Sequence, residues 1–380
     1  MKIEEIKAGV IKNSRGEDAI EILVNKKYKG STASGASNGK HEVPCFSPKG
    51  ISFSVDFVNK NSHFKNFYLE EFSDLAVFDP FIPIIGGNSV VALQLACLKA
   101  MADNKVYSFL DSITKKMPIP LGNCIGGGAH SSAGTYIQEF LLIPEKKTVA
   151  ERIALNREIY NAIGCISKAK KKTDEGAFVL PKPDQEVFSF LDDVLEGFRN
   201  NGHKINFGLD IASSQLYNKG KYNYKNFASS QKRRILTREE QVEQVNAWIK
   251  AFGLTYVEDP LQEEDFNGFS KISKKTLVCG DDLVTTNIER LKIALKENSV
   301  NCVIVKPNQI GSLVKTKEFV DFCHKKGIVT VLSHRSGETM DNSLSHLAVG
   351  WKIPYIKIGI FGKERECKLQ ELIRIEQEIS

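Results

Sequence analysis

The chain has 380 residues, of which 42% are hydrophobic and 26% are charged, so it can bury a large core and is not expected to be disordered. Its formal net charge of +6 is spread along the sequence, and no basic segment is interleaved with aromatic residues, so nucleic-acid binding is not expected. Apolar stretches stay below the roughly 18–20 residues that cross a membrane, and the charged N-terminus lacks a signal-peptide pattern, so we expect a cytoplasmic protein without a membrane span.

Residues 1–117 are predicted to form a small α+β domain. The segments IKAGVIKNS and DAIEILVN, which begin at Ile6 and Asp18, alternate like strands and are separated by a turn. The Gly- and Ser-rich stretch 29–41 predicts a mobile loop that covers a ligand. The stretch from Gly86 to Ala102 is apolar at helical spacing and contains no proline, which indicates a helix.

After Pro118, short apolar runs alternate with amphipathic helical patterns such as TREEQVEQVNAWIKAFG and LVKTKEFVDFCHKKG. This alternation predicts serial βα units with parallel strands. We therefore expect residues 118–380 to form a β/α barrel that ends in a C-terminal helix. An open, doubly wound sheet is the alternative, but no G-x-G-x-x-G turn follows the first strand.

Six of the apolar runs end in a polar side chain. These side chains are Asp210, Glu258, Asp281, Lys306, His334 and Lys357, and the last five are separated by 23, 25, 28 and 23 residues. Because the C-terminal ends of barrel strands meet at one mouth, we expect all six side chains in one pocket. The alternative, that acidic residues after strands only cap helices, would explain one of them but not the regular series.

Three carboxylates in this series predict a Mg²⁺ site. Asp210, Glu258 and Asp281 offer the hard oxygen ligands that Mg²⁺ prefers, and without a cation they would repel one another. Lys306 and Lys357 add positive charge at the same mouth. A lysine near Mg²⁺ and a second lysine should have a lowered pKa and could act as a general base. The alternative is that both lysines only neutralise the carboxylates.

The segment after His334 predicts a phosphate site. Arg335 offers paired donors and Ser336 offers a hydroxyl group, a combination that suits phosphate. Ser37, in the predicted loop, could close over such a ligand. A metal, a lysine base and a phosphate clamp together suit proton abstraction next to a carboxylate, where the resulting enolate needs concentrated positive charge.

From about Ile11 to the C-terminus the chain resembles the enolase family. The resemblance rests on motifs in the same order along the chain: NSRG at 13–16, GAS-x-G-x-HE at 35–42, GGGAH at 126–130, IQEFLLIP at 137–144, DEGAF at 174–178, GLDIASS at 208–214, VEDP at 257–260, GDDLVTTN at 280–287, VKPNQIGS at 305–312, SHRSGET at 333–339 and IKIG at 356–359. It implies an α/β fold, with an enolase-type β/α barrel whose first units are irregular and an N-terminal α+β capping domain.

The resemblance also implies two Mg²⁺ ions and a role for each matched residue. Asp210, Glu258 and Asp281 match the ligands of the tighter ion, and Ser37 matches a ligand of the second ion that also meets the substrate. The remaining matches are Lys306 as the base at carbon 2, Glu175 as the acid at carbon 3, Glu139 as its carboxylate partner, His130 and His334 in the pocket beside the substrate, Arg335 and Ser336 at the phosphate, and Lys357 at the substrate carboxylate. A carboxylic acid beside another carboxylate should have a raised pKa, which suits Glu175 as a proton donor.

The implied activity is the reversible, Mg²⁺-dependent dehydration of 2-phosphoglycerate to phosphoenolpyruvate, a step of glycolysis and gluconeogenesis, in a homodimer or higher homo-oligomer. Several positions depart from the family pattern. Asn38 stands where threonine is usual, and Met340 replaces an acidic residue. The segment 43–85 is shorter and more irregular than is usual in the family. Two alternatives therefore stay open: a lyase for another phosphorylated hydroxy acid, and a non-catalytic binding protein with the enolase fold.

Overall fold

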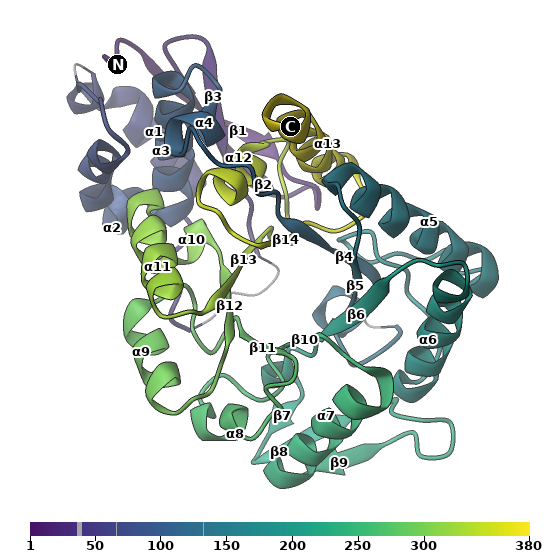
Figure 1. The fold of residues 1–380 in the computed structure, drawn as a ribbon. Coiled ribbons are helices and arrows are strands. Elements are labelled where there is room, and N and C mark those ends of the chain that lie inside the picture. The colour runs from purple at the N-terminus through teal and green to yellow at the C-terminus, as the bar shows by residue number, and fades with distance from the viewer. Residues whose placement is uncertain (36–39, 66, 132) are drawn as a thin grey trace.

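The computed structural model describes residues 1–35, 40–65, 67–131 and 133–380 (Figure 1). Its N-terminal part contains an antiparallel sheet in the order β1 (Ile6–Lys12), β2 (Asp18–Val24), β3 (Tyr28–Ser31). The apolar helix α3 (Gly87–Met101) packs against β2 and β3, as its sequence pattern predicted. Gly30 allows the close approach, because a Cβ atom there would lie 2.3 Å from the carbonyl oxygen of Ala92. No helix within the described residues is long and apolar enough to cross a membrane.

The predicted loop at 29–41 begins later than expected, because residues 28–31 pair with β2 as strand β3. Ser37 and Asn38 lie outside the described residues. The irregular stretch 43–85 forms short elements: α1 (Ile51–Lys60), η1 (Ser62–Phe64), η2 (Phe72–Phe81) and α2 (Ile82–Ile85). Phe64 contacts Phe57, Phe78 and Phe81 edge-on, so an aromatic cluster holds these elements together. Helix α4 (Val106–Leu110) then leads to the barrel.

Eight strands close into a barrel in the order β10-β11-β12-β13-β14-β4-β5-β6. They are β4 (Ile119–Gly126), β5 (Glu139–Pro144), β6 (Ile205–Asp210), β10 (Tyr256–Glu258), β11 (Leu277–Gly280), β12 (Cys302–Val305), β13 (Val329–Ser333) and β14 (Tyr355–Lys357). β5 is antiparallel to both of its neighbours, and the other barrel pairs are parallel. The barrel is therefore closed, and its first units are irregular, as expected.

Helices surround the barrel (Figure 1). The longer ones are α5 (Val149–Ser167), α6 (Asp184–Asn200), α7 (Arg238–Phe252), α9 (Ile288–Lys296), α11 (Leu313–Lys325), α12 (Ser343–Gly350) and α13 (Lys363–Ile379). Shorter elements are η3 (Gly128–His130), η4 (Ser213–Gln215), α8 (Phe266–Ser270), α10 (Pro307–Ile310) and a small sheet of β7 (Tyr217–Asn218), β8 (Lys221–Tyr224) and β9 (Arg234–Leu236). Thr148 and Thr237 begin α5 and α7 with capping boxes, which satisfy N–H groups that the helices leave open.

The N-terminal part reaches the barrel at the segment that follows β13. Ser34 and Gly337 exchange two backbone hydrogen bonds of 3.0 and 2.9 Å, and the backbone N–H of Ser14 donates to the Glu338 carbonyl at 2.7 Å. A Cβ atom at Gly337 would lie 2.4 Å from Nδ2 of Asn13, so this contact requires glycine. The segments around Ser14 and Ser34 therefore lie beside the predicted phosphate-binding residues.

Candidate functional site

Five of the six predicted strand-end side chains, all except Glu258, line one pocket at the barrel mouth. Lining residues include the basic side chains Lys306, Arg335 and Lys357, and the acidic side chains Glu42, Glu139, Glu175, Asp210, Asp259, Asp281 and Asp282. Glu258 lies directly behind them and is fully buried. The free space is only about 60 Å³, because the side chains pair with one another across the mouth. The pocket therefore contains more acidic than basic groups and little room.

Lys357, the last residue of β14, joins carboxylates from three strands. Its Nζ lies 3.2 Å from Glu139, 3.0 Å from Asp210 and 3.0 Å from Glu258. Burial disfavours the charged ammonium, but these carboxylates outweigh burial and raise the pKa of Lys357 well above its ordinary value. Glu258 also accepts a hydrogen bond of 2.6 Å from the Tyr256 hydroxyl group. Lys357 is thus a fixed positive charge at the centre of the site.

Lys306 follows β12, and its ammonium group forms an ion pair with the Asp281 carboxylate. Burial lowers the pKa of Lys306, but Asp281 outweighs burial and leaves the pKa raised. The lowering of this pKa by a neighbouring Mg²⁺ ion stays a prediction, because the raised value comes from the pairing with Asp281. The prediction assumed a metal ion beside Asp281, whereas here the lysine itself neutralises that carboxylate.

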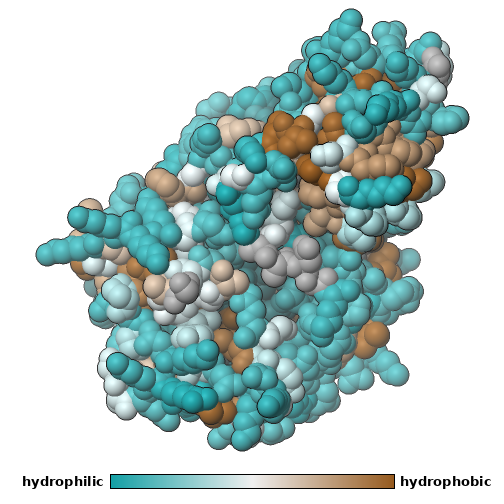
Figure 2. All heavy atoms as spheres, turned by 180° about the vertical axis from the view of Figure 1, so that it is seen from behind, coloured by the Kyte–Doolittle hydropathy of each residue, from teal (hydrophilic) through white to brown (hydrophobic). Residues whose placement is uncertain are grey.

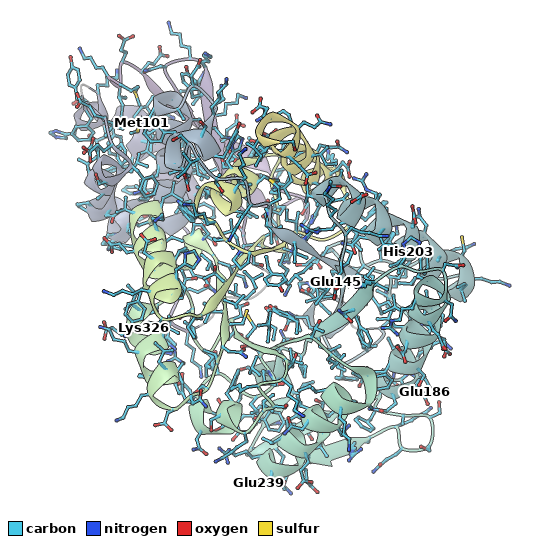
Figure 3. All side chains as sticks on the ribbon, in the orientation of Figure 1. Met101, Glu145, Glu186, His203, Glu239 and Lys326 are labelled. Atoms are coloured by element: carbon cyan, nitrogen blue, oxygen red, sulfur yellow. The ribbon has the colours of Figure 1, made fainter. Side chains whose placement is uncertain are left out.

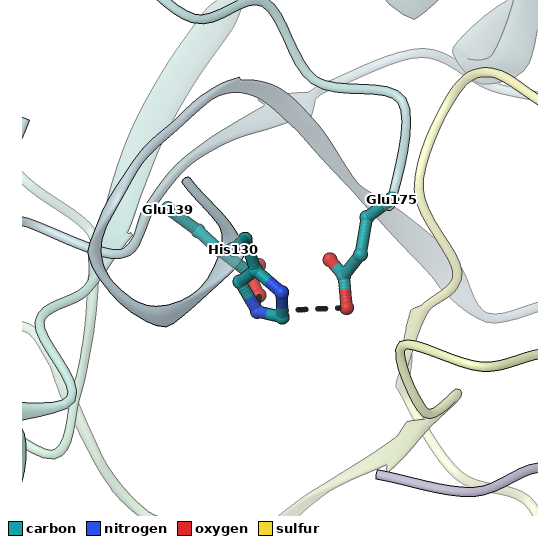
Figure 4. A group of neighbouring side chains, drawn as sticks. All are labelled: His130, Glu139 and Glu175. Carbon is teal, nitrogen blue, oxygen red and sulfur yellow. Dashed lines mark ion pairs between the residues drawn. The ribbon is translucent and has the colours of Figure 1, made fainter. Parts of the chain in front are cut away.

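The loop histidine His130 brings two glutamates together (Figure 4). Its Nε2 lies 3.9 Å from Glu139 and 3.8 Å from Glu175, and its Nδ1 is 2.8 Å from Asp174. His334 approaches Glu175 from another side, at 3.6 Å. Glu139 reaches the mouth because β5 runs antiparallel, so the first residue of β5 lies opposite Asp210, the last residue of β6.

The two glutamates differ in proton affinity. Burial raises the pKa of Glu139 well above its ordinary value, with Glu175 and Asp210 adding repulsion. Burial acts on Glu175 in the same direction, but His130 and His334 outweigh it and hold the pKa of Glu175 well below its usual range. The neighbouring carboxylates in turn raise the pKa of His130 to about 9, against the effect of burial. The predicted raised pKa of Glu175 is thus wrong, and Glu139 has it instead.

Arg335 is held by a glutamate that sequence reasoning did not select. Nη1 and Nη2 of Arg335 donate to the two oxygen atoms of Glu42, at 3.0 and 3.2 Å, and Nη1 also donates to Asn308 at 3.3 Å. The hydroxyl group of Ser336 accepts a hydrogen bond from Arg15 at 3.2 Å. The signal for Glu42 was its place in the matched segment 35–42. Ser37, the predicted second-metal ligand, lies outside the described residues.

The acidic side of the pocket fits a divalent cation. Oxygen atoms of Asp259, Asp281 and Asp282 lie within 4.8 Å of one another. Burial and the neighbouring Asp281 raise the pKa of Asp282 to about 7, and burial and Asp210 raise that of Glu258 to about 8. These shifts reflect negative charge that the local lysines do not fully compensate. An all-oxygen donor set with excess negative charge suits Mg²⁺.

The predicted ligands approach this arrangement from different sides. Asp210 and Glu258 end adjacent strands and share Lys357, whereas Asp281 is turned towards Lys306. Sequence reasoning missed Asp259 and Asp282, although the motifs VEDP and GDDL contain them. Asp259 accepts hydrogen bonds from the backbone N–H groups of Asp281 and Asp282, at 3.0 and 2.9 Å, and so fixes the turn that carries them.

Comparisons with known proteins agree with the barrel fold. The family described as "Enolase, C-terminal TIM barrel domain" matches residues 114–380. The chain is 37% identical to an enolase of Methanocorpusculum labreanum over 403 aligned positions, which cover 99% of both chains. It is 34% identical to an enolase of Thermoplasma acidophilum and 36% identical to one of Archaeoglobus fulgidus, each alignment covering 99% of this chain and 98% of the relative.

Proposed function

The chain belongs to the enolase family, and from this membership we infer how its barrel mouth converts 2-phosphoglycerate to phosphoenolpyruvate. The reaction makes the protein a carbon–oxygen lyase of glycolysis. Because the relatives match along nearly the full chain, the family supports both the N-terminal part and the barrel as parts of one enzyme. We propose that residues 1–117 cap the mouth and that residues 118–380 form the catalytic barrel.

We propose that Lys306 removes the proton at carbon 2. Its side chain lines the mouth, is only 13% exposed and directly follows a barrel strand, so the backbone positions it firmly. Lys306 can accept this proton only as a neutral amine, whereas the ion pair with Asp281 favours its ammonium form. Lys306 must therefore leave Asp281 and lose its proton before it can act. This requirement couples the base to the charge bound at Asp281.

We propose that the family's two Mg²⁺ ions would be held by Asp210, Glu258 and Asp281 at one position and with the help of Ser37 at the other. When bound, Mg²⁺ supplies positive charge for the negative charge that develops on the substrate carboxylate. The ammonium group of Lys357 lies among Glu139, Asp210 and Glu258, beside the proposed metal ligands. From there it adds positive charge for the substrate carboxylate. Arg335 and Ser336 bind the phosphate. The phosphate then accepts the hydrogen bonds that the Arg335 guanidinium group donates to Glu42 in this structure.

We propose that Glu175 and Glu139 act as a pair at carbon 3. Glu139 favours the protonated form and Glu175 the charged form, and His130 lies within 4 Å of both. The pair therefore stores one proton next to the leaving hydroxide. Glu175 receives this proton within the pair and passes it to the departing hydroxide, which leaves as water, and His130 and His334 keep the Glu175 carboxylate oriented. The observation that carries the whole proposal is this convergence of a base, a proton-storing pair and an acidic cation site on one mouth.

A homo-oligomer is proposed from the surface of the N-terminal part. Hydrophobic side chains gather over this part of the molecule (Figure 2). Val77, Ile84 and Phe109 of the N-terminal part are exposed, with exposed fractions of 37%, 40% and 38%. Exposed apolar patches commonly mark protein–protein contacts. We therefore propose that a second copy of the chain covers this surface.

The direct test is formation of phosphoenolpyruvate from 2-phosphoglycerate by the purified full chain. We expect turnover with Mg²⁺, loss of turnover with EDTA, and recovery when excess Mg²⁺ is added. Lys306→Ala should be inactive, whereas Lys326→Ala, which changes an exposed lysine after α11, should behave like the wild type. A folded, Mg²⁺-binding protein that never forms phosphoenolpyruvate would contradict the proposal.

A further inference from the structure

A cavity of about 670 Å³ lies at the end of the barrel opposite the catalytic mouth. Its lining includes Ile119 and Val329, the first residues of β4 and β13, and Pro354, which precedes β14. The proposed catalytic residues lie instead at the C-terminal ends of the strands. The turn after α11 adds Gly327 and Ile328 to the lining, and the labelled Lys326 of Figure 3 marks where this turn begins. The cavity is therefore separate from the catalytic site.

Basic side chains from separate segments meet at this cavity. They are Lys115, Lys116, Lys147, Arg152 and Lys352. The one carboxylate among the described lining residues, Glu376, already accepts hydrogen bonds from the backbone N–H groups of Val149 and Ala150, at 2.6 and 3.2 Å. The N–H groups at the start of α5 thus compensate much of the negative charge of Glu376.

Part of the positive charge is also compensated. Lys352 pairs with Asp111, and Nε of Arg152 donates to the Lys146 carbonyl at 2.9 Å. The exposed Lys115, Lys116 and Lys147 form no ion pair with any residue that the structure describes. Three ammonium groups therefore remain available to a ligand.

The floor of the cavity is apolar. Met117, Ile119, Ile328, Val329 and Ile353 contribute to it. His324 also lines the cavity, and desolvation lowers its pKa. An apolar floor beneath a basic rim suits a ligand with two parts, one apolar and one carrying several negative charges. The volume falls within the range of about 300–1,000 Å³ that is usual for small-molecule sites.

We propose that this cavity binds a small organic polyphosphate. The phosphate groups contact Lys115, Lys116 and Lys147, and the organic part covers the apolar floor. The three lysines come from two segments of the chain, and all three line the cavity. This inference does not depend on the reaction at the opposite mouth.

The test is calorimetric titration of the full chain in metal-free buffer at low ionic strength, with ATP, tripolyphosphate and adenosine as probes. The test variant combines Lys115→Ala, Lys116→Ala and Lys147→Ala. A matched control combines Lys225→Ala, Lys232→Ala and Lys250→Ala, which remove the same charge from exposed positions elsewhere. We expect the wild type to bind one ATP per chain. The test variant should bind ATP roughly tenfold or more weakly, because it loses three exposed ion pairs with the phosphates. The affinity of the control variant should be unchanged.

ATP should bind more tightly than tripolyphosphate, because only ATP has a part that covers the apolar floor. Adenosine alone should bind more weakly than either. Equal loss of ATP affinity in both triple variants would overturn the proposal, since it would show attraction by net charge rather than binding in the cavity. Absence of ATP and tripolyphosphate binding to the wild type would overturn it as well. Tripolyphosphate binding as tightly as ATP would refute the contact with the floor.

Discussion

The proposed substrate-binding cations are already paired in the structure. Lys306 contacts Asp281, Lys357 contacts Glu258, and Arg335 contacts Glu42. With only about 60 Å³ of free space in the pocket, ligands must open these pairs when they bind. Binding is thus an exchange of ion pairs, in which cations satisfy the carboxylates and the substrate satisfies the lysines and the arginine.

The pairing of Arg335 predicts the behaviour of Glu42→Gln. Both side chains are about 95% buried, and removing one charge of a buried pair costs about 3–5 kcal/mol of unfolding free energy. Phosphate should restore part of this loss by binding the released guanidinium group. We therefore expect the melting temperature to fall in the variant, and to rise more with inorganic phosphate than it does in the wild type.

Glu264→Gln is the matched control, because Glu264 pairs with Arg290 at a site where 47% of the Glu264 side chain is exposed. Its melting temperature should change little, since exposed ion pairs contribute less than about 1 kcal/mol. An equal effect of phosphate on Glu42→Gln and the wild type would contradict the proposed exchange at Arg335.

The sequence allowed a good prediction of which residues meet at the mouth. It allowed a poorer prediction of their pKa values. The position of Glu175 in its motif placed it in the pocket, but its pKa depends on His130 and His334, which come from distant segments. Glu42 was missed as the partner of Arg335 because the two residues are 293 positions apart. Such pairings follow from tertiary structure rather than from local pattern.

At the level of elements, one carboxylate ties the last helix to α12. Glu371 of α13 lies 2.8 Å from His346 of α12 and 2.6 Å from Arg374 on its own helix. Burial opposes the charged form, but His346 and Arg374 outweigh it and lower the pKa of Glu371 to about 2. The helix pair thus gains stability only while Glu371 is ionised.

Glu371→Gln should therefore destabilise the protein in a pH-dependent way. A folded-state pKa below the unfolded value means that the unfolded protein binds more protons between about pH 4.5 and 2, so this stability is complete above pH 4.5 and is lost as the pH falls through that window. Denaturant titrations should show a loss of about 2 kcal/mol at pH 6. A difference between the variant and the wild type that stayed constant down to pH 3 would contradict the argument.

The elements themselves were largely predictable. Apolar runs that end in polar residues became β6 and β10–β14, and the helical patterns became α7 and α11. The direction of β5 was not readable from its residues, because a buried run such as EFLLIP carries no sign of parallel or antiparallel pairing. Only the resemblance to a family indicated that the first barrel units are irregular.

For the whole molecule, the acidic mouth predicts that Mg²⁺ stabilises the fold. The pKa values of Glu258 and Asp282 are raised because burial disfavours their charged forms and the neighbouring carboxylates Asp210 and Asp281 add repulsion. A cation that binds only the folded chain adds stability, about 2.7 kcal/mol at one hundred times its dissociation constant. Melting temperatures should therefore rise with MgCl₂ but not with KCl at equal ionic strength. Equal effects of the two salts would contradict a cation site at the mouth.

The central claim, that Lys306 is the base and Glu175 acts at a later step, is tested most directly by proton exchange at carbon 2. The measurement is NMR of 2-phosphoglycerate in D₂O with Mg²⁺ and the full chain. We predict that the wild type exchanges the carbon-2 proton and that Lys306→Ala does not, although it still binds Mg²⁺. Glu175→Gln should retain exchange while forming little phosphoenolpyruvate. Exchange that survives in Lys306→Ala would contradict the account.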